Sequence, residues 1–167
     1  MPMTPFVERF PDFGPRETRF ISVPQEHDLP AGDYGFLELY CNEPGCDCRR
    51  VTILVLRPET GWSKPWATIG FGWETLDFYK KWGGARSDPL EMQGPYLDPL
   101  NVQTQHSPAL LDVFRLILQS PDYVERLKRH YQMFRKSVEN DKRNSLDTSR
   151  LQNKRRRLRD PQRRHPH

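Results

Sequence analysis

Residues 34–73 of the chain read YGFLELYCNEPGCDCRRVTILVLRPETGWSKPWATIGFGW. Within this segment, residues 34–41 alternate between two faces, with Phe36, Glu38 and Tyr40 on one of them. Residues 51–56 form a β-branched and apolar run, and residues 66–73 alternate apolar side chains with small ones. Each of the three patterns predicts a β-strand.

The connections between these strands contain turn-forming residues. Pro44 and Gly45 suit the centre of a type II turn, because proline pre-sets φ and glycine supplies a positive φ. Residues 57–65 hold two prolines and a glycine and suit a long hairpin loop. We therefore expect an antiparallel meander of three strands, or four with a short strand at residues 19–23. The glycines of residues 66–73 would let a helix or the N-terminal arm approach closely.

Helical patterns follow the meander. Residues 74–82 can form a short helix that ends at two glycines. Ser107-Pro108 and Ser120-Pro121 each offer an N-cap followed by proline, and so predict two further helices. The second of these carries a single apolar stripe: Val124, Leu127, Tyr131, Phe134 and Val138. The fold class is α+β, with C-terminal helices packed on an antiparallel sheet.

The two ends of the chain differ from its middle. A length of 167 residues suits one domain, which we place at residues 19–140. Residues 1–18 are rich in proline and predict an arm. From residue 141 to 167 the apolar pattern stops, which predicts a disordered basic tail. Residues 142–167 carry a formal charge of +8 and the remainder about −4, so the basicity belongs to the tail alone.

The sharpest chemical feature is the cluster Cys41-x4-Cys46-x-Cys48. The turn at Pro44-Gly45 would bring Cys41 and Cys48 face to face in a zinc-knuckle-like hairpin, with Cys46 projecting from the loop. An odd number of closely spaced cysteines does not suit a disulfide framework, and a reducing compartment keeps thiols available for metal. Soft thiolates in such a cluster favour zinc.

A closed tetrahedral zinc site needs a fourth ligand. We favour His106, which stands on a loop end before the first C-terminal helix. His27 lies beyond the far end of the first strand, roughly 20 Å away at about 3.3 Å per residue. His130 falls beside the apolar stripe, where a packed or solvated histidine is expected. The acidic alternatives are Asp47, Glu74 and Asp77.

Two other interpretations of the cysteines stay open. Free cysteine packs as a small hydrophobe, so the three thiols could be structural. Arg49 and Arg50 would lower thiol pKa values by Coulomb attraction, which suits redox or nucleophilic chemistry. The same arginines would also offset the negative charge of a thiolate-bound zinc.

The cysteine pattern, from Tyr40 through Asp47 to Arg50, resembles a family of uncharacterised bacterial proteins. The likeness extends to GPYLDPLN at residues 94–101 and DYVERLKRHY at residues 122–131. It implies a shared fold over residues 34–135 and a bacterial source. It implies no activity, because none is assigned to the family.

The basic tail suggests a polyanionic partner. Its densest run is Lys154, Arg155, Arg156 and Arg157. Such a run binds nucleic acid by counterion release, with little sequence specificity. The tail contains no aromatic residue, so stacking on single-stranded bases is not indicated. The alternative is a terminus that only adds solubility.

Other classes of function leave no trace in the sequence. There is no apolar run of membrane-spanning length and no signal-peptide pattern, so we expect a cytoplasmic protein without a membrane partner. The common nucleotide, hydrolase and metalloprotease motifs are absent. We therefore expect a small zinc-stabilised interaction module with an unknown protein partner. The alternatives are a nucleic-acid-associated protein acting through its tail, and a thiol- or zinc-dependent enzyme.

Overall fold

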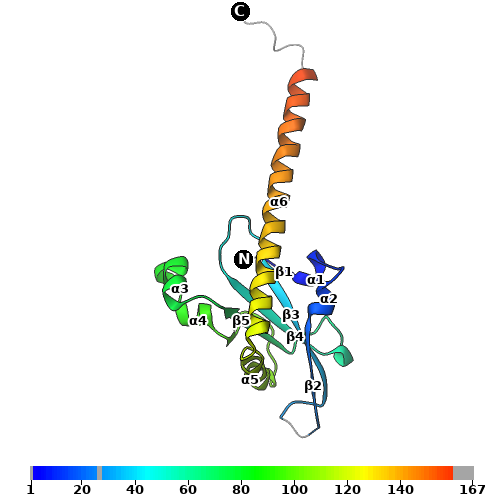
Figure 1. The fold of residues 1–167 in the computed structure, drawn as a ribbon, viewed down its shortest axis with the longest axis vertical. Helices are drawn as coiled ribbons and strands as arrows, with labels where there is room; N and C mark the ends of the chain where they lie inside the picture. The colour runs from blue at the N-terminus through cyan, green and yellow to red at the C-terminus, as the bar shows by residue number, and fades with distance from the viewer. Residues whose placement is uncertain (1, 26–27, 160–167) are drawn as a thin grey trace, which may run out of the picture.

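The computed structural model describes residues 2–25 and 28–159, and they form an α+β fold around one antiparallel sheet (Figure 1). The sheet has six strands in the order β1-β3-β4-β5-β6, and β2 also pairs with β3. Their bounds are β1 Met3–Pro5, β2 Arg19–Val23, β3 Gly32–Cys41, β4 Arg50–Leu56, β5 Ala67–Gly72 and β6 Tyr96–Leu97. The predicted meander is confirmed as β3-β4-β5, in which neighbouring strands are antiparallel.

The strand periodicity divides the sheet into two unlike faces. Phe36, Tyr40 and Ile53 are fully buried on the face that we call the packed face. Alternate residues such as Leu39 and Leu54 point to the opposite side, which we call the open face, and are only partly buried. The alternation follows from the two-residue repeat of a β-strand.

Two helices cover the packed face: α5, Ser107–Ile117, and α6, Pro121–Arg159 (Figure 1). Phe114 of α5 stacks on Phe36 with ring centroids 6.1 Å apart. The apolar stripe of α6 is also buried, except for Val124, which is half-buried. Helix α5 begins at Ser107 and has His106 at its N-cap position, so it starts one residue earlier than the sequence predicted with Ser107 as the N-cap. The Ser107 hydroxyl instead donates a hydrogen bond to the carbonyl oxygen of Trp66.

Shorter helices fill the edges of the fold. They are α1 Phe6–Arg9, α2 Gly14–Glu17, α3 Leu76–Gly83 and α4 Pro89–Gln93, with 3-10 turns at Pro58–Thr60 and Gly84–Arg86. Helix α3 matches the helix predicted at residues 74–82. Its Tyr79 hydroxyl lies over Gly72, and the ring of Tyr96 lies over Gly70. The glycine positions of β5 therefore admit aromatic side chains from α3 and β6, and not the N-terminal arm.

The N-terminal arm has more regular structure than its proline content predicts. Strand β1 pairs with the end of β3, with Met3 opposite Cys41. Phe6 of α1 is buried against Tyr40 and stacks on His130 with ring centroids 4.1 Å apart. The arm is thus part of the core.

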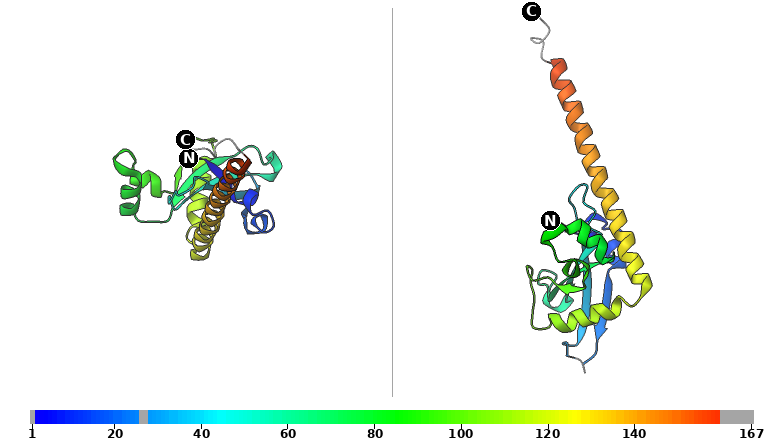
Figure 2. Two further views of the ribbon diagram at one scale, coloured as in Figure 1. Left: turned by 90° about the horizontal axis from the view of Figure 1, so that it is seen from above. Right: turned by 90° about the vertical axis from the view of Figure 1, so that its left-hand side faces the viewer.

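Helix α6 runs beyond the packed body (Figure 2). We predicted disorder from residue 141, but the backbone is helical to Arg159, and residues 141–156 are exposed. The segment contains neither proline nor glycine and consists largely of residues that tolerate a helix, so the packed part of α6 propagates into it. Within the described residues, no helix combines the length and the apolar character needed to cross a bilayer.

Candidate metal centre

The candidate site lies in the turn between β3 and β4. The backbone N–H of Cys46 donates to the carbonyl oxygen of Glu43 at 3.2 Å, and Gly45 has a φ of 78°. Proline before a glycine with positive φ gives the type II turn that the sequence predicts. The turn returns the chain, so that Cys41 at the end of β3 faces Cys48 just before β4.

The three cysteine sulfurs are close enough to share one metal ion. The Sγ atoms of Cys41, Cys46 and Cys48 all lie within 4.8 Å of one another. A tetrahedral zinc with bonds of about 2.3 Å separates its sulfur ligands by about 3.8 Å, so a small inward movement completes the geometry. All three cysteines are in the described part of the chain, and none forms a disulfide. The cluster can therefore hold a metal ion.

Burial sets the proton affinity of these thiols. Cys41 and Cys48 are buried and Cys46 is half-buried, and this desolvation raises the pKa of each thiol. The charges of Arg135 and Arg50 oppose the rise at Cys41 and Cys48 without overcoming it. Reactive cysteines have lowered pKa values, so the environment argues against a nucleophilic or redox thiol. A bound metal would displace the protons instead.

Helix α6 holds the cysteine loop from one side. The Arg135 guanidinium donates to the carbonyl oxygens of Cys41 and Glu43, both at 2.9 Å. It also pairs with Glu139 at 2.9 Å, and the Glu139 carboxylate accepts a hydrogen bond from the backbone N–H of Gly45 at 2.5 Å. That hydrogen bond, aided by the Arg135 charge, lowers the pKa of Glu139. We call the side chains of Arg135 and Glu139 the loop clamp.

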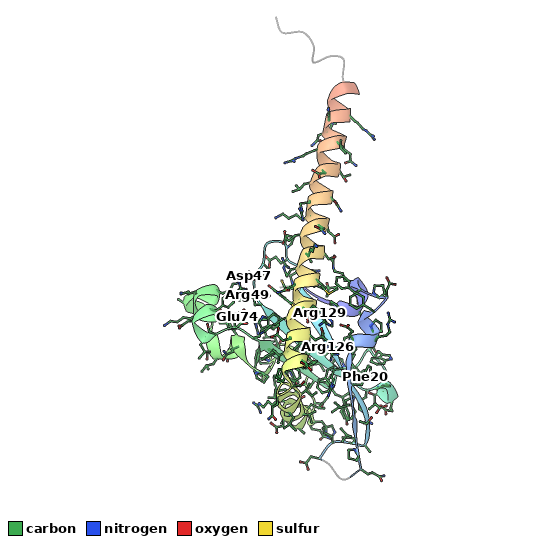
Figure 3. All side chains as sticks on the ribbon, in the orientation of Figure 1. Phe20, Asp47, Arg49, Glu74, Arg126 and Arg129 are labelled. Atoms are coloured by element: carbon green, nitrogen blue, oxygen red, sulfur yellow. The ribbon has the colours of Figure 1, made fainter. Side chains whose placement is uncertain are left out.

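Arg49 organises the other side of the loop. Its backbone has a φ of 47°, and its N–H donates to the Tyr131 hydroxyl at 3.1 Å. Its guanidinium pairs with Asp47 at 2.9 Å and with Glu74 at 3.3 Å, and stacks over Phe78. Figure 3 shows Asp47, Arg49 and Glu74 together beside α6. Asp47 and Glu74, which the sequence offered as possible metal ligands, are thus both paired with Arg49.

The structure does not bring His106 to the cysteines. Its ring stacks on Trp66, with centroids 5.0 Å apart, just before β5 begins. The cysteines lie at the opposite end of the sheet, because Arg50 pairs with Gly72 and Val55 pairs with Ala67. Five residues at about 3.3 Å each separate the two ends by about 16 Å or more. His27 is outside the described residues. Among those described, the metal-capable group consists of the three cysteines.

His130 is a core residue, in agreement with the packed alternative. It is 1% exposed, and its Nδ1 atom lies 2.6 Å from a carboxylate oxygen of Glu38. Its other ring nitrogen contacts Glu17. The sequence contained one indication of the contact between His130 and Glu38. Glu38 lies on the otherwise apolar face of the strand at residues 34–41, where a buried carboxylate needs a polar partner.

Sequence reasoning missed the loop clamp. Arg135 and Glu139 stand four residues apart on the predicted helix, a spacing that indicates an ion pair and no further role. Their contact with residues 41–45 depends on how α6 crosses the sheet.

The basic run of the tail is separate from this site. Lys154, Arg155 and Arg156 are exposed on the projecting part of α6, and Arg157 follows them in the same helix. Figure 1 places this part of the helix away from the sheet. The predicted metal and nucleic-acid residues therefore belong to two different regions.

Comparison of the chain with protein-family models, with curated proteins and with solved structures found no match in any of the three. The resemblance to an uncharacterised bacterial family stays a prediction.

Proposed function

We propose that this chain is a small cytosolic interaction module stabilised by zinc bound to Cys41, Cys46 and Cys48. The observation that supports it is the convergence of three sulfur atoms within 4.8 Å in one short loop. Zinc accepts thiolate ligands and has no redox chemistry, and we assign it the role of a cross-link in the loop. Water or a donor from a bound partner completes the coordination in place of His106.

The bound ion would join three points of the hairpin. Cys41 ends β3, Cys46 closes the turn, and Cys48 precedes β4. A cross-link there would fix the loop against the loop clamp of α6 and against Tyr131. The loop and this part of α6 would then form one rigid surface for a protein partner.

Metal analysis of the purified protein tests the proposal. We expect about one zinc per chain after expression in zinc-supplemented medium, and loss of the metal in Cys48→Ser. His106→Ala is the matched control, because it removes the histidine that sequence reasoning favoured, and it should retain the zinc. Wild-type protein without bound metal would refute the proposal, and loss of zinc in His106→Ala would restore that histidine as a ligand.

A second candidate function is nucleic-acid binding by the projecting part of α6. Residues 141–159 hold eight Lys and Arg residues against two Asp residues, and they are helical. An α-helix fits the major groove of a duplex, and its basic side chains displace counterions from the phosphates. The exposed residues of this segment include Lys154, Arg155 and Arg156.

A truncation after Asn140 tests this second function. Duplex binding at low salt should be abolished in the truncated protein, and in the full chain it should fall steeply as salt rises. Replacement of Lys80 and Lys81 by glutamine, on α3, is the control and should leave binding unchanged. Equal binding by the truncated and full-length proteins would transfer the activity to the body.

A further inference from the structure

The open face of the sheet contains a cavity of about 490 Å³. Its floor is formed by Leu39, Thr52 and Leu54, which alternate with buried residues of the packed face. Cys48 lies in the wall at one end. Cavities of roughly 300–1,000 Å³ with a mostly apolar lining are typical of sites for small organic ligands.

One wall of the cavity, from residues 98–102, is held by hydrogen bonds to Thr68, a buried residue of β5. Thr68 is 1% exposed, and its carbonyl oxygen accepts from the Asp98 N–H at 2.9 Å and from the Gln103 side chain at 2.8 Å. Its hydroxyl donates to the carbonyl oxygen of Val102 at 3.0 Å. The cavity is therefore preformed, as ligand sites usually are.

Two apolar side chains of this wall are unusually exposed. Leu100 is 91% exposed and Val102 is 56% exposed, and both line the cavity. Exposed aliphatic side chains at a cavity favour an occupant that covers them, because burial of apolar surface is stabilising.

Arg50 supplies a positive charge at the cavity. Its guanidinium donates to the Tyr96 hydroxyl and stacks on the same ring at 5.6 Å from the centroid. Its Nε atom is buried and makes no hydrogen bond in the described part of the chain. Among the described residues, Arg49 forms ion pairs with two carboxylates, whereas Arg50 forms no ion pair. A partly buried cation without an anion is a candidate recognition group.

Asp98 is the carboxylate that lines the same cavity. One of its oxygens accepts from the Leu100 N–H and the other from the Asn101 side chain, both at 2.9 Å or less. These hydrogen bonds hold the wall in place and direct the carboxylate to its own loop. The Arg50 guanidinium is left for a ligand.

We propose that this cavity binds a small organic carboxylate with an apolar body. The carboxylate pairs with Arg50, because a guanidinium and a carboxylate form parallel charge-assisted hydrogen bonds. The apolar body lies on Leu39 and Leu54 and is covered by Leu100. The proposal goes beyond the zinc module and does not depend on a bound metal.

Calorimetric titration with 3-phenylpropionate and 4-methylvalerate tests the proposal in the full-length protein. Wild-type protein should bind both at micromolar to millimolar concentration. Arg50→Met, which keeps the length of the side chain, and Thr52→Trp, which fills the cavity, should each weaken binding by about tenfold or more. Arg115→Met removes an exposed arginine of α5, which covers the packed face, and should bind like wild type. Thermal melting of each variant confirms that it is folded.

The controls separate charge from apolar contact. The primary amides of the two acids should bind at least about tenfold more weakly, because they lack the anion. Inorganic phosphate should bind more weakly too. No binding of either carboxylate to the wild type, or equal binding to Arg50→Met, would overturn the proposal, as would tighter binding of phosphate.

The same samples distinguish this inference from the zinc proposal. Carboxylate binding by protein that contains no zinc would support the cavity site and refute the zinc module. Zinc-loaded protein that binds no carboxylate would overturn the cavity site alone.

Discussion

The two faces of the sheet are made from alternate residues of the same strands, yet they have different roles. On the packed face, Phe36 and Ile53 are fully buried under the helices. On the open face, Thr52 and Leu54 line a cavity together with Cys48. The difference follows from which face α5 and α6 cover. Stability is concentrated on the packed face, and the candidate ligand chemistry on the open one.

The largest expected effect is the loss of an aromatic ring from the packed face. Phe114→Ala should lower the free energy of unfolding by about 3–5 kcal/mol, because Phe114 is fully buried and contacts Phe36 and Phe71. Leu54→Ala on the open face is the matched truncation and should cost distinctly less. Chemical denaturation of both variants measures the difference, and similar losses would contradict the division between the faces.

Zinc saturation should have the next largest effect. At a free zinc concentration a hundredfold above the dissociation constant, the ion adds about 2.7 kcal/mol to the stability, and a chelator removes it. Thermal melting with zinc and with chelator measures this shift. The Cys48→Ser protein should show no shift, and a zinc-dependent rise in that variant would place the metal elsewhere.

Disruption of the loop clamp tests the contact between α6 and the cysteine loop. Arg135→Met should cost about 2 kcal/mol, because two backbone carbonyl groups lose a charged donor. Lys136→Met, at the exposed neighbouring position, should change stability by about 0.5 kcal/mol or less. Zinc affinity should also fall in the first variant. If both variants are equally stable, the clamp contributes nothing.

The smallest effect concerns acid stability through Glu17. Its contact with His130 and the charge of Arg129 lower the pKa of the Glu17 carboxyl below 4.5. As the pH falls, the unfolded chain protonates Glu17 at a higher pH than the folded chain does. The ionised Glu17 therefore contributes to stability above pH 4.5, and this stability is lost as the pH falls through the lowered pKa of the folded state. Glu17→Gln should therefore lose less stability than wild type below pH 4.5. Denaturation at several pH values checks this, with Glu125→Gln as the control; parallel curves would exclude the contribution.

Local patterns determined much of the fold. The two-residue alternation at residues 34–41 and the apolar run at residues 51–56 predicted two central strands and their faces. Pro44-Gly45 predicted the turn, and the turn predicted that the cysteines meet. These predictions succeed because strand pleating and turn dihedral angles depend on neighbouring residues.

The tertiary structure alone decided the contacts between distant segments. His106 is held near Trp66 by the hydrogen bonds of its loop, so it never reaches the cysteines. Arg135 reaches the cysteine loop because α6 crosses the sheet at that point. Among the described residues, Arg49 pairs with two carboxylates and Arg50 with none, although the two arginines are adjacent.

The sequence by itself determined the strands, the turn and the gathering of three sulfurs, since each of these depends on residues within a few positions of one another. The tertiary structure decided what surrounds them: the clamp from α6, the place of His106 and the cavity beside Cys48. Such contacts depend on the packing of segments far apart in the chain, and no local pattern specifies which distant side chains meet.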